Sequence, residues 1–380
     1  MAGIYLHIPF CQTRCVYCDF YSTTRTELRP RYVRALCREL RERSSYFRGQ
    51  PVRTVYLGGG TPSQLAEPEL EFIFHTLEAT FGLGSCEEIT LEANPDDLTA
   101  DYIHMLARRT PINRVSIGLQ TLHEPTLRLL RRRHTARQAL EAVTACRAAG
   151  LSNLSIDLIY GLPGETDEQW ADDLRQVLNL DVDHISAYHL TYEEGTDLHL
   201  MRQRGQVHEV DEESSLRQFT MLVDTLTAAG YEHYEISNFC RPGHHSLHNS
   251  AYWQGVPYLG CGPSAHSFDG ESREWNVADL QAYILGMENG HRPYERELLS
   301  LTTRYNECVM TALRTASGLD LTALQQAFGP ELHRYCLRLA APHIRSGRLQ
   351  ATEDGHLRLT RQGIFISDGI IADLMALNEK

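Results

Sequence analysis

The chain has 380 residues, of which 42% are hydrophobic and 22% charged, and its formal net charge at pH 7 is −13. This composition indicates a folded globular protein with a large core, and the acidic balance disfavours nucleic acid as a partner, because phosphate binding needs a basic surface. No apolar run of about eighteen residues could span a membrane, and the first predicted strand follows Met1 too closely for a signal peptide, so we expect a cytoplasmic protein.

The first predicted strand, 3–8, leads into a loop with three cysteines. After Pro9 come Cys11, Cys15 and Cys18, spaced C-x3-C-x2-C. Three thiolates on one loop match three corners of a [4Fe–4S] cluster, because soft sulfur is the preferred ligand of iron–sulfur clusters. No fourth cysteine is nearby, so one iron would stay open for another ligand. A zinc ion with His7 as its fourth ligand is the alternative.

From residue 3 to about residue 239, short β-rich runs alternate with helical stretches, which is typical of β-α units with a parallel sheet. We predict strands at 3–8, 52–57, 88–92, 112–119, 153–160, 183–190 and 231–236. We predict helices at 30–43, 67–80, 99–108, 135–149, 167–179 and 212–229. Six or seven such units fall short of a closed eight-stranded barrel, and the chemistry of such folds gathers where the strands end.

Several strand ends carry unusual residues. Three glycines follow strand 52–57, and they let the backbone approach a ligand closely, although a tight barrel turn would also explain them. Glu92 ends the third strand, and Gln120 points toward the rim after the fourth. Asp157 lies inside an apolar strand, where an acid is costly unless it is paired or functional. These positions are candidates for ligand binding.

Residues 240–299 are rich in histidine, aromatic residues and glycine, without clear periodicity. A flat porphyrin needs an axial nitrogen ligand and aromatic or apolar faces, which His248, Tyr252 and Trp253 offer. The alternative is that these residues cap the open side of the barrel and that the histidines are only hydrogen bonded. Weaker candidates for a ligand are His244, His245 and His266.

From about residue 300 the pattern changes to helices at 303–315, 320–328 and 331–345, a hairpin turning at Asp354-Gly355, and a last helix after Gly363. This order is typical of a winged helix. Winged helices often bind DNA, but here acidic residues largely offset the arginines, so we do not expect nucleic-acid binding.

The chain resembles the radical S-adenosylmethionine (SAM) enzymes, in particular the coproporphyrinogen-dehydrogenase-like branch and its HemW-type heme chaperones. The resemblance is carried by Tyr5-x-His7-Ile8-Pro9-Phe10-Cys11, by Cys18-Asp19-Phe20 and by His248-Asn249-x-x-Tyr252-Trp253. It implies an α/β fold with a partial (β/α)6 radical-SAM barrel at 1–239, a connecting segment at 240–299 and a mainly helical, winged-helix-like domain at 300–380.

The resemblance also implies the sites. The [4Fe–4S] cluster would be held by Cys11, Cys15 and Cys18. SAM would contact Tyr5, Phe20, Gly58, Gly59, Gly60, Thr61, Glu92, Gln120, Arg132 and Asp157. Arg131 and Arg133 leave the choice of arginine open by one residue. Heme would bind His248, Asn249, Tyr252 and Trp253.

The resulting hypothesis is a heme chaperone that binds the cluster, SAM and heme and delivers heme to target proteins such as respiratory enzymes, membrane-associated ones among them. Alternatives are oxygen-independent coproporphyrinogen III oxidase and a radical-SAM methyltransferase. Such oxidases carry a further cysteine where this chain has Phe20, together with an N-terminal extension, whereas HNxxYW indicates a chaperone. The sequence leaves SAM cleavage, the axial heme ligand, the acceptor and a homodimer open.

Overall fold

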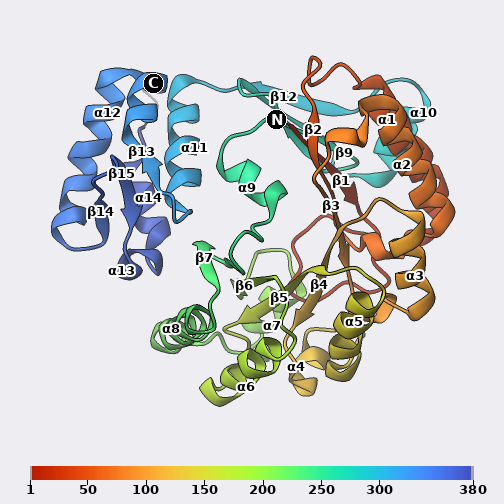
Figure 1. The fold of residues 1–380 in the computed structure, drawn as a ribbon, viewed down its shortest axis with the longest axis horizontal. Helices are drawn as coiled ribbons and strands as arrows, with labels where there is room; N and C mark the ends of the chain where they lie inside the picture. The colour runs from red at the N-terminus through yellow and green to blue at the C-terminus, as the bar shows by residue number, and fades with distance from the viewer. Residues whose placement is uncertain (1, 378–380) are drawn as a thin grey trace.

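Six parallel strands and the helices outside them form a barrel that is open on one side (Figure 1). The computed structural model describes residues 2–377. The strands are β1 (Ala2–Ile8), β2 (Val52–Gly59), β3 (Glu88–Ala93), β4 (Arg114–Gln120), β5 (Asn153–Tyr160) and β6 (His184–His189). The main outer helices are α1 (Arg29–Glu42), α2 (Glu67–Phe81), α3 (Ala100–Arg109), α5 (Ala136–Ala148), α6 (Asp167–Leu178) and α8 (Glu212–Ala228). The predicted partial (β/α)6 barrel is confirmed.

Each parallel strand alternates between an apolar outer side and a more polar inner side. Leu57 of β2 and Leu91 of β3 are fully buried in the core beneath the helices. Their chain neighbours Tyr56 and Glu92 point to the opposite side and line an interior cavity. Parallel strands covered on both faces usually read as continuous apolar runs. The alternation therefore marks an inner face that surrounds a cavity instead of a second hydrophobic layer.

The predicted seventh strand departs from the parallel pattern. Residues 231–236 contain β7 (Glu232–Glu235), which pairs antiparallel with β8 (Asn238–Cys240), and β8 pairs antiparallel with β6. On this side of the sheet the parallel order therefore ends at β6. Two short helices, α4 (Glu124–Leu129) and α7 (Asp197–Gln203), were not predicted, because six or seven residues are too few for a clear helical period.

Residues 240–299, predicted as a connecting segment, contribute strands to the barrel's own sheet. β9 (Tyr258–Cys261) pairs parallel with β1, and β10 (His266–Phe268), β11 (Ser272–Asn276) and β12 (Tyr294–Leu298) continue the sheet antiparallel. The segment also forms α9 (Leu247–Trp253) and α10 (Leu280–Glu288). Strands of three to five residues are too short to show a period in the sequence.

The C-terminal part has its own core around Tyr305, Val309 and Leu357. It consists of α11 (Leu301–Leu313), β13 (Leu319–Asp320), α12 (Leu321–Arg345), β14 (Leu349–Ala351), β15 (His356–Leu359), α13 (Arg361–Ile364) and α14 (Ser367–Leu374). Helix α12 is kinked at Gly329, where φ is +82°, just before Pro330 and at the predicted break between two helices. The order of elements agrees with the predicted winged-helix-like domain.

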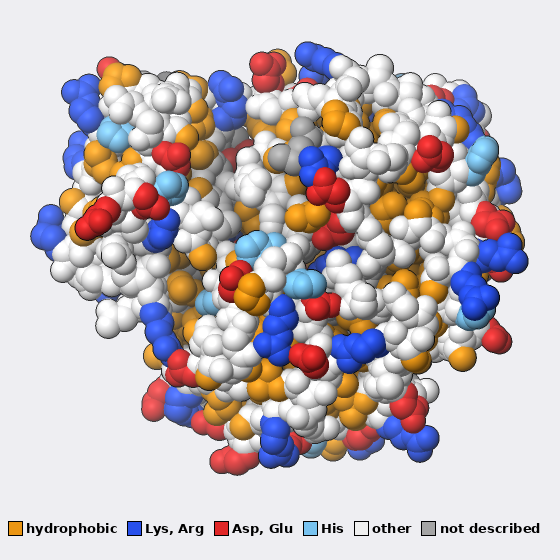
Figure 2. All heavy atoms as spheres, in the orientation of Figure 1, with side chains coloured by type: hydrophobic (Ala, Val, Ile, Leu, Met, Phe, Trp, Pro, Cys, Tyr) orange, Lys and Arg blue, Asp and Glu red, His pale blue; other side chains and the backbone are white. Residues whose placement is uncertain are grey.

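The surface mixes charges of both signs. Figure 2 shows acidic and basic side chains interspersed over the visible face, including the C-terminal domain at the left. None of the helices within residues 2–377 combines the length and the apolar character needed to cross a membrane.

The buried carboxylate of Glu39 connects residues 240–299 to helix α1 of the barrel. Glu39 of α1 is fully buried and pairs with Arg43. It accepts hydrogen bonds from the Gly262 amide (2.9 Å), Asn276 Nδ2 (2.9 Å) and the Tyr283 hydroxyl (2.6 Å). The partners come from the loop after β9, from β11 and from α10. One side chain of α1 therefore binds three different parts of residues 240–299.

We expect Glu39→Ala to lower the free energy of unfolding by about 3–5 kcal/mol, because it leaves the buried Gly262 amide and Tyr283 hydroxyl without this acceptor and Arg43 with Glu274 as its remaining carboxylate partner. The measurement is guanidinium denaturation followed by tryptophan fluorescence. The control is Glu42→Ala, which removes the exposed pair with Arg38 and should cost at most about 1 kcal/mol. Equal losses in the two variants would contradict the fastening role of Glu39.

Candidate functional site

A cavity of about 850 Å³ lies at the carboxyl ends of the parallel strands. Its wall also includes Phe365 and Asp368 of the C-terminal domain. Most of the predicted site residues line it: Cys11, Cys15, Cys18, Phe20, Gly59, Gly60, Thr61, Glu92, Gln120, Arg132, Asp157 and Asn249. The predicted residues outside its wall are Tyr5, Gly58, His248, Tyr252 and Trp253. Residues predicted from widely separated parts of the chain therefore meet in one place.

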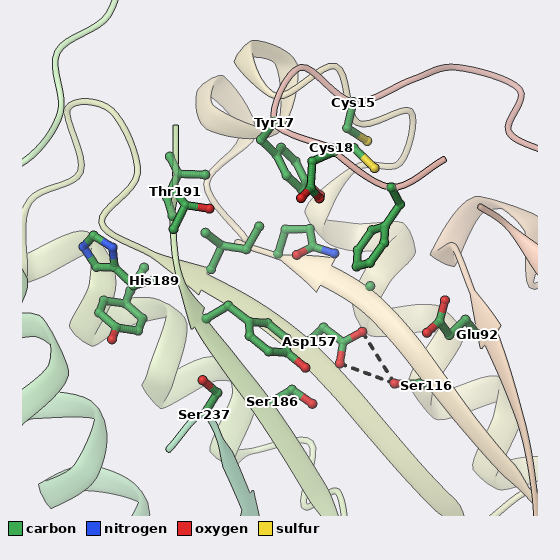
Figure 3. A pocket seen from close by; sticks show the side chains of 18 of the residues that line it. Cys15, Tyr17, Cys18, Glu92, Ser116, Asp157, Ser186, His189, Thr191 and Ser237 are labelled. Carbon is green, nitrogen blue, oxygen red and sulfur yellow. Dashed lines mark hydrogen bonds between the residues drawn. The ribbon is translucent and has the colours of Figure 1, made fainter. Parts of the chain in front are cut away.

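The cysteine loop forms the roof of this cavity (Figure 3). Its base is closed by two backbone hydrogen bonds, from Thr23 N–H to the Pro9 carbonyl (2.7 Å) and from Cys11 N–H to the Thr23 carbonyl (2.9 Å). Thr61 Oγ1 donates to Cys11 Sγ at 3.3 Å, and Arg132 Nη1 lies 3.5 Å from Cys15 Sγ. Burial raises the pKa of Cys11, and the hydrogen bond from Thr61 opposes that rise.

The donor set fits an iron–sulfur cluster better than zinc. All three cysteines are free thiols on the cavity wall. Both ring nitrogens of His7 are engaged, Nδ1 at 3.0 Å from the Tyr5 hydroxyl and Nε2 at 2.8 Å from the Tyr21 carbonyl oxygen, so His7 has no free lone pair for zinc. Burial raises the pKa of Cys18 to about 11, so binding of a metal at this thiol would release a proton.

Close packing explains the glycine run. A Cβ on Gly58 would lie 2.9 Å from Glu92 Oε1. Gly59 has φ of +102°, and a Cβ there would lie 2.5 Å from the His7 ring. A Cβ on Gly60 would lie 2.7 Å from the Ile8 carbonyl oxygen, to which the Gly60 amide donates at 2.8 Å. The run lets the end of β2 pack directly against the strand that leads into the cysteine loop.

Glu92 lies on the inner face of β3. Its carboxylate accepts hydrogen bonds from the Tyr56 hydroxyl (2.7 Å) and the Gly59 amide (3.2 Å). Burial raises the pKa of Glu92 to about 7, against the opposing effect of these hydrogen bonds, and the charge of Asp157 adds to the rise. A cationic ligand would therefore find a carboxylate that ionises near neutral pH.

Asp157 faces the same cavity from β5. Ser116 Oγ lies 3.3 and 3.5 Å from its two carboxylate oxygens, as the dashed lines in Figure 3 show. Burial raises the pKa of Asp157, while hydrogen bonds from Ser186 and Ser116 and the charge of Arg114 act in the opposite direction. The acid inside the apolar strand is thus paired, and it remains part of the cavity wall.

The structure separates the three consecutive arginines. Arg131 pairs with Asp197, and Arg133 lies 2.9 Å from Asp97 Oδ1. Arg132 alone of the three lines the cavity. Its Nη2 donates at 2.7 Å both to Asn94 Oδ1 and to the Gly118 carbonyl, whereas its buried Nε has no partner within residues 2–377. An orphaned guanidinium nitrogen at this place suits an anionic ligand group.

Asn94 was not among the predicted site residues, although it orients Arg132 and also donates to Thr61 Oγ1 at 3.3 Å. The spacing of the residues could have identified it: side chains two positions apart in a strand point to the same side, so Asn94 would lie on the cavity side with Glu92. Gln120 holds φ of +69° beside an irregular register at Gly118, and non-glycine residues with this backbone are often found at functional sites.

The HNxxYW motif forms α9, which separates two cavities. Asn249 lines the cavity below the cysteine loop, whereas Tyr252 and Trp253 line a second cavity. His248 is 2% exposed between them. Its Nδ1 lies 2.8 Å from Thr54 Oγ1 and its Nε2 2.9 Å from the Tyr252 hydroxyl, so in this arrangement neither nitrogen has a lone pair free for iron.

Comparison with known proteins agrees with this geometry. Residues 5–177 match the model of the radical SAM superfamily, and residues 299–366 match that of the HemN C-terminal domain. The chain is 34% identical to a heme chaperone HemW of Mycobacterium tuberculosis, over 98% of this chain and 94% of the relative. It is 37% identical to heme chaperone HemW of Escherichia coli, over 90% and 84%.

Two further proteins are similar to this chain over most of its length. The mitochondrial radical S-adenosyl methionine domain-containing protein 1 of Bos taurus is 32% identical, over 99% of this chain and 87% of the relative. Among solved structures, coproporphyrinogen III oxidase (HemN) of Escherichia coli, described as a radical SAM enzyme, superposes with a TM-score of 0.85. That match covers 98% of this chain and 90% of the oxidase at 24% identity, and it shows a shared fold.

The raised pKa of Glu92 predicts a pH-dependent stability. Its side chain is neutral in both states below the unfolded pKa of about 4.3, whereas above the folded pKa of about 7 the native protein must hold a buried charge. We expect Glu92→Gln to match the wild-type melting temperature of the apo-protein near pH 4 and to exceed it near pH 8. The exposed Glu71→Gln is the control, and a constant difference across this range would contradict the assignment.

Proposed function

The chain belongs to the HemW family of radical SAM proteins, and from this we propose that it is a heme chaperone that binds a [4Fe–4S] cluster, SAM and heme and passes heme to acceptor proteins in the cytoplasm or at the membrane. The observation that carries the proposal is the identity of 31–37% with bacterial proteins called heme chaperone HemW. The shared fold with coproporphyrinogen III oxidase comes with only 24% identity.

The residues of the first cavity fit the cluster and SAM. Cys11, Cys15 and Cys18 would hold the cluster, which when bound supplies an electron and an open iron for the amino and carboxylate groups of SAM. Arg132 offers its unpartnered Nε to the SAM carboxylate, and Glu92 offers a carboxylate to a cationic group. Asp157 accepts from hydroxyl donors at the cavity wall, as the ribose would require.

Not all of the other residues that the resemblance predicts to contact SAM lie on the wall of the first cavity. Thr61, Gln120, Gly59 and Gly60 line the first cavity, so direct contacts are available to them. Tyr5 lines the second cavity instead, and its ring lies 6.2 Å from that of Tyr56, which binds Glu92. A contribution of Tyr5 to SAM binding would therefore pass through Tyr56 and Glu92.

The proposed function predicts saturable heme binding without decarboxylase activity. After anaerobic reconstitution, hemin titration followed by the Soret band should saturate near one heme per chain, and the loaded protein should transfer heme to an apo-heme protein. Release of carbon dioxide from coproporphyrinogen III, with SAM and a reductant, should not exceed that of a Cys18→Ser control. SAM-dependent decarboxylation without specific heme binding would identify the protein as an oxidase instead.

Binding of SAM should depend on Arg132 and not on Arg131. Arg132→Ala removes a charge-assisted contact worth about 1.5–3 kcal/mol, so we expect the dissociation constant for SAM to rise about 10- to 150-fold. Arg131→Ala, which removes only an exposed ion pair, should change it less than about threefold. Isothermal titration calorimetry of the reconstituted proteins measures both constants, and equal effects would place the SAM carboxylate elsewhere.

A further inference from the structure

A second cavity, of about 1420 Å³, lies between α9, the open edge of the barrel and the C-terminal domain. Aromatic side chains from several elements line it: Tyr252, Trp253, Tyr258, Phe268 and Phe328. Helices α11 and α12 supply the opposite wall, including Met310 and Leu324. Polar and charged side chains also line this cavity, but apolar surface predominates, which suits a flat, largely apolar ligand with polar substituents.

Four histidines line this cavity, and three of them are engaged. His7 uses both ring nitrogens. His233 Nε2 lies 3.0 Å from the Ile236 carbonyl oxygen, and His245 Nε2 lies 3.2 Å from Glu232 Oε2, so among the described residues each of these rings keeps only Nδ1 without a partner. Nδ1 is the nitrogen nearer to Cβ and is the more hindered of the two for a porphyrin iron. An axial ligand to iron needs an imidazole nitrogen with a free lone pair in a position that the metal can reach.

His266, at the start of β10, is the exception. Its side chain is exposed, and within residues 2–377 neither of its ring nitrogens makes a hydrogen bond or an ion pair. Its ring is stacked on that of Trp275, with centroids 5.9 Å apart and planes inclined by 25°. Stacking limits the rotation of the ring and leaves its edge, with both nitrogens, available to a ligand.

The same cavity contains an arginine without an acidic partner. Arg273 on its wall pairs with Glu307 at 2.9 Å, whereas the guanidinium of Arg304 forms no ion pair within the described residues, and its buried Nε has no partner. The buried indole Nε1 of Trp253 also lacks a partner there. Two unsatisfied donors on an aromatic wall suit a ligand with acceptor groups, such as carboxylates.

We propose that this second cavity is the heme-binding site, with His266 as the axial ligand of the iron and Arg304 as the partner of a propionate. The inference rests on the proposed function, since it assigns the place where the chaperone would hold heme. It gives His248 a positioning role: the ring holds Tyr252 at the cavity wall through a contact of 2.9 Å and does not touch the iron.

Hemin titration of the reconstituted full-length protein tests the ligand. We expect His266→Ala to raise the dissociation constant for hemin at least about tenfold and to abolish the Soret and visible bands of histidine-ligated heme. His75→Ala, an exposed histidine on α2, should change neither. His266→Cys is the second variant, and it should bind heme with the shifted Soret band of thiolate ligation, which a structural role of His266 would not produce.

The propionate contact is tested with a modified ligand. Hemin dimethyl ester, which lacks both carboxylates, should bind the wild type about tenfold more weakly than hemin, and Arg304→Gln should remove most of that difference. Arg334→Gln, on the exposed side of α12, is the matched control and should retain the discrimination. Unchanged discrimination in Arg304→Gln would overturn the assignment of Arg304.

The outcomes separate this inference from the proposed function. If the wild type binds no heme specifically, the proposed function itself fails. If the wild type and His266→Ala bind equally well with identical spectra, while His248→Ala loses the bands of histidine-ligated heme, the chaperone function stands and the location proposed here is wrong. If His248→Ala keeps the wild-type spectrum but binds more weakly, the positioning role of His248 is supported.

Discussion

The polar inner face of the parallel sheet is the constraint on which the rest of this structure depends. A polar group in the interior costs free energy unless it is hydrogen bonded, so each strand that turns such a residue inward must also supply a partner. Tyr56 meets Glu92, Ser116 meets Asp157, and Thr54 meets His248. The pairs connect neighbouring strands or α9 across the interior, and they leave the carboxyl ends of the strands free to receive ligands.

Helix α9 closes the other end of this interior. Glu88, buried at the start of β3, accepts hydrogen bonds from the amides of Leu247 (2.8 Å) and His248 (2.9 Å) and so satisfies the first turn of the helix. The imidazole of His248 then stacks on Tyr56, with ring centroids 5.1 Å apart. The four motif residues therefore face different environments, and one short helix contributes to both cavities.

The sequence predicted the elements whose periods are long enough to detect. Strand 52–57 corresponds to β2 at Val52–Gly59 and helix 67–80 to α2 at Glu67–Phe81, because alternation and helical spacing persist over several repeats. The short strands β8 to β12 escaped prediction, since three to five residues show no clear period, and β9 is defined by its pairing with the distant β1.

The sequence motifs were enough to predict where the candidate site lies, but not which neighbouring residue of each type lines it. Cysteine spacing, glycines and acids at strand ends located the first cavity, because the carboxyl ends of parallel strands lie at one edge. The choice of Arg132 depended on tertiary pairing, since Arg131 and Arg133 find their acids on other segments. Likewise, no pattern in the sequence distinguishes His266, whose ring nitrogens are free, from His248, whose ring nitrogens are both engaged.

The end of the cysteine loop is shared by the two cavities. Asp19 and Phe20, directly after Cys18, line both, and the Phe20 side chain is 62% exposed. Binding of a cluster at the three thiols would restrict the motion of this loop. It would thereby also hold Asp19 and Phe20 in place on the wall of the second cavity. A cluster would then serve a heme-binding protein by ordering that wall, a role that requires no cleavage of SAM and is compatible with a chaperone built on an enzyme's fold.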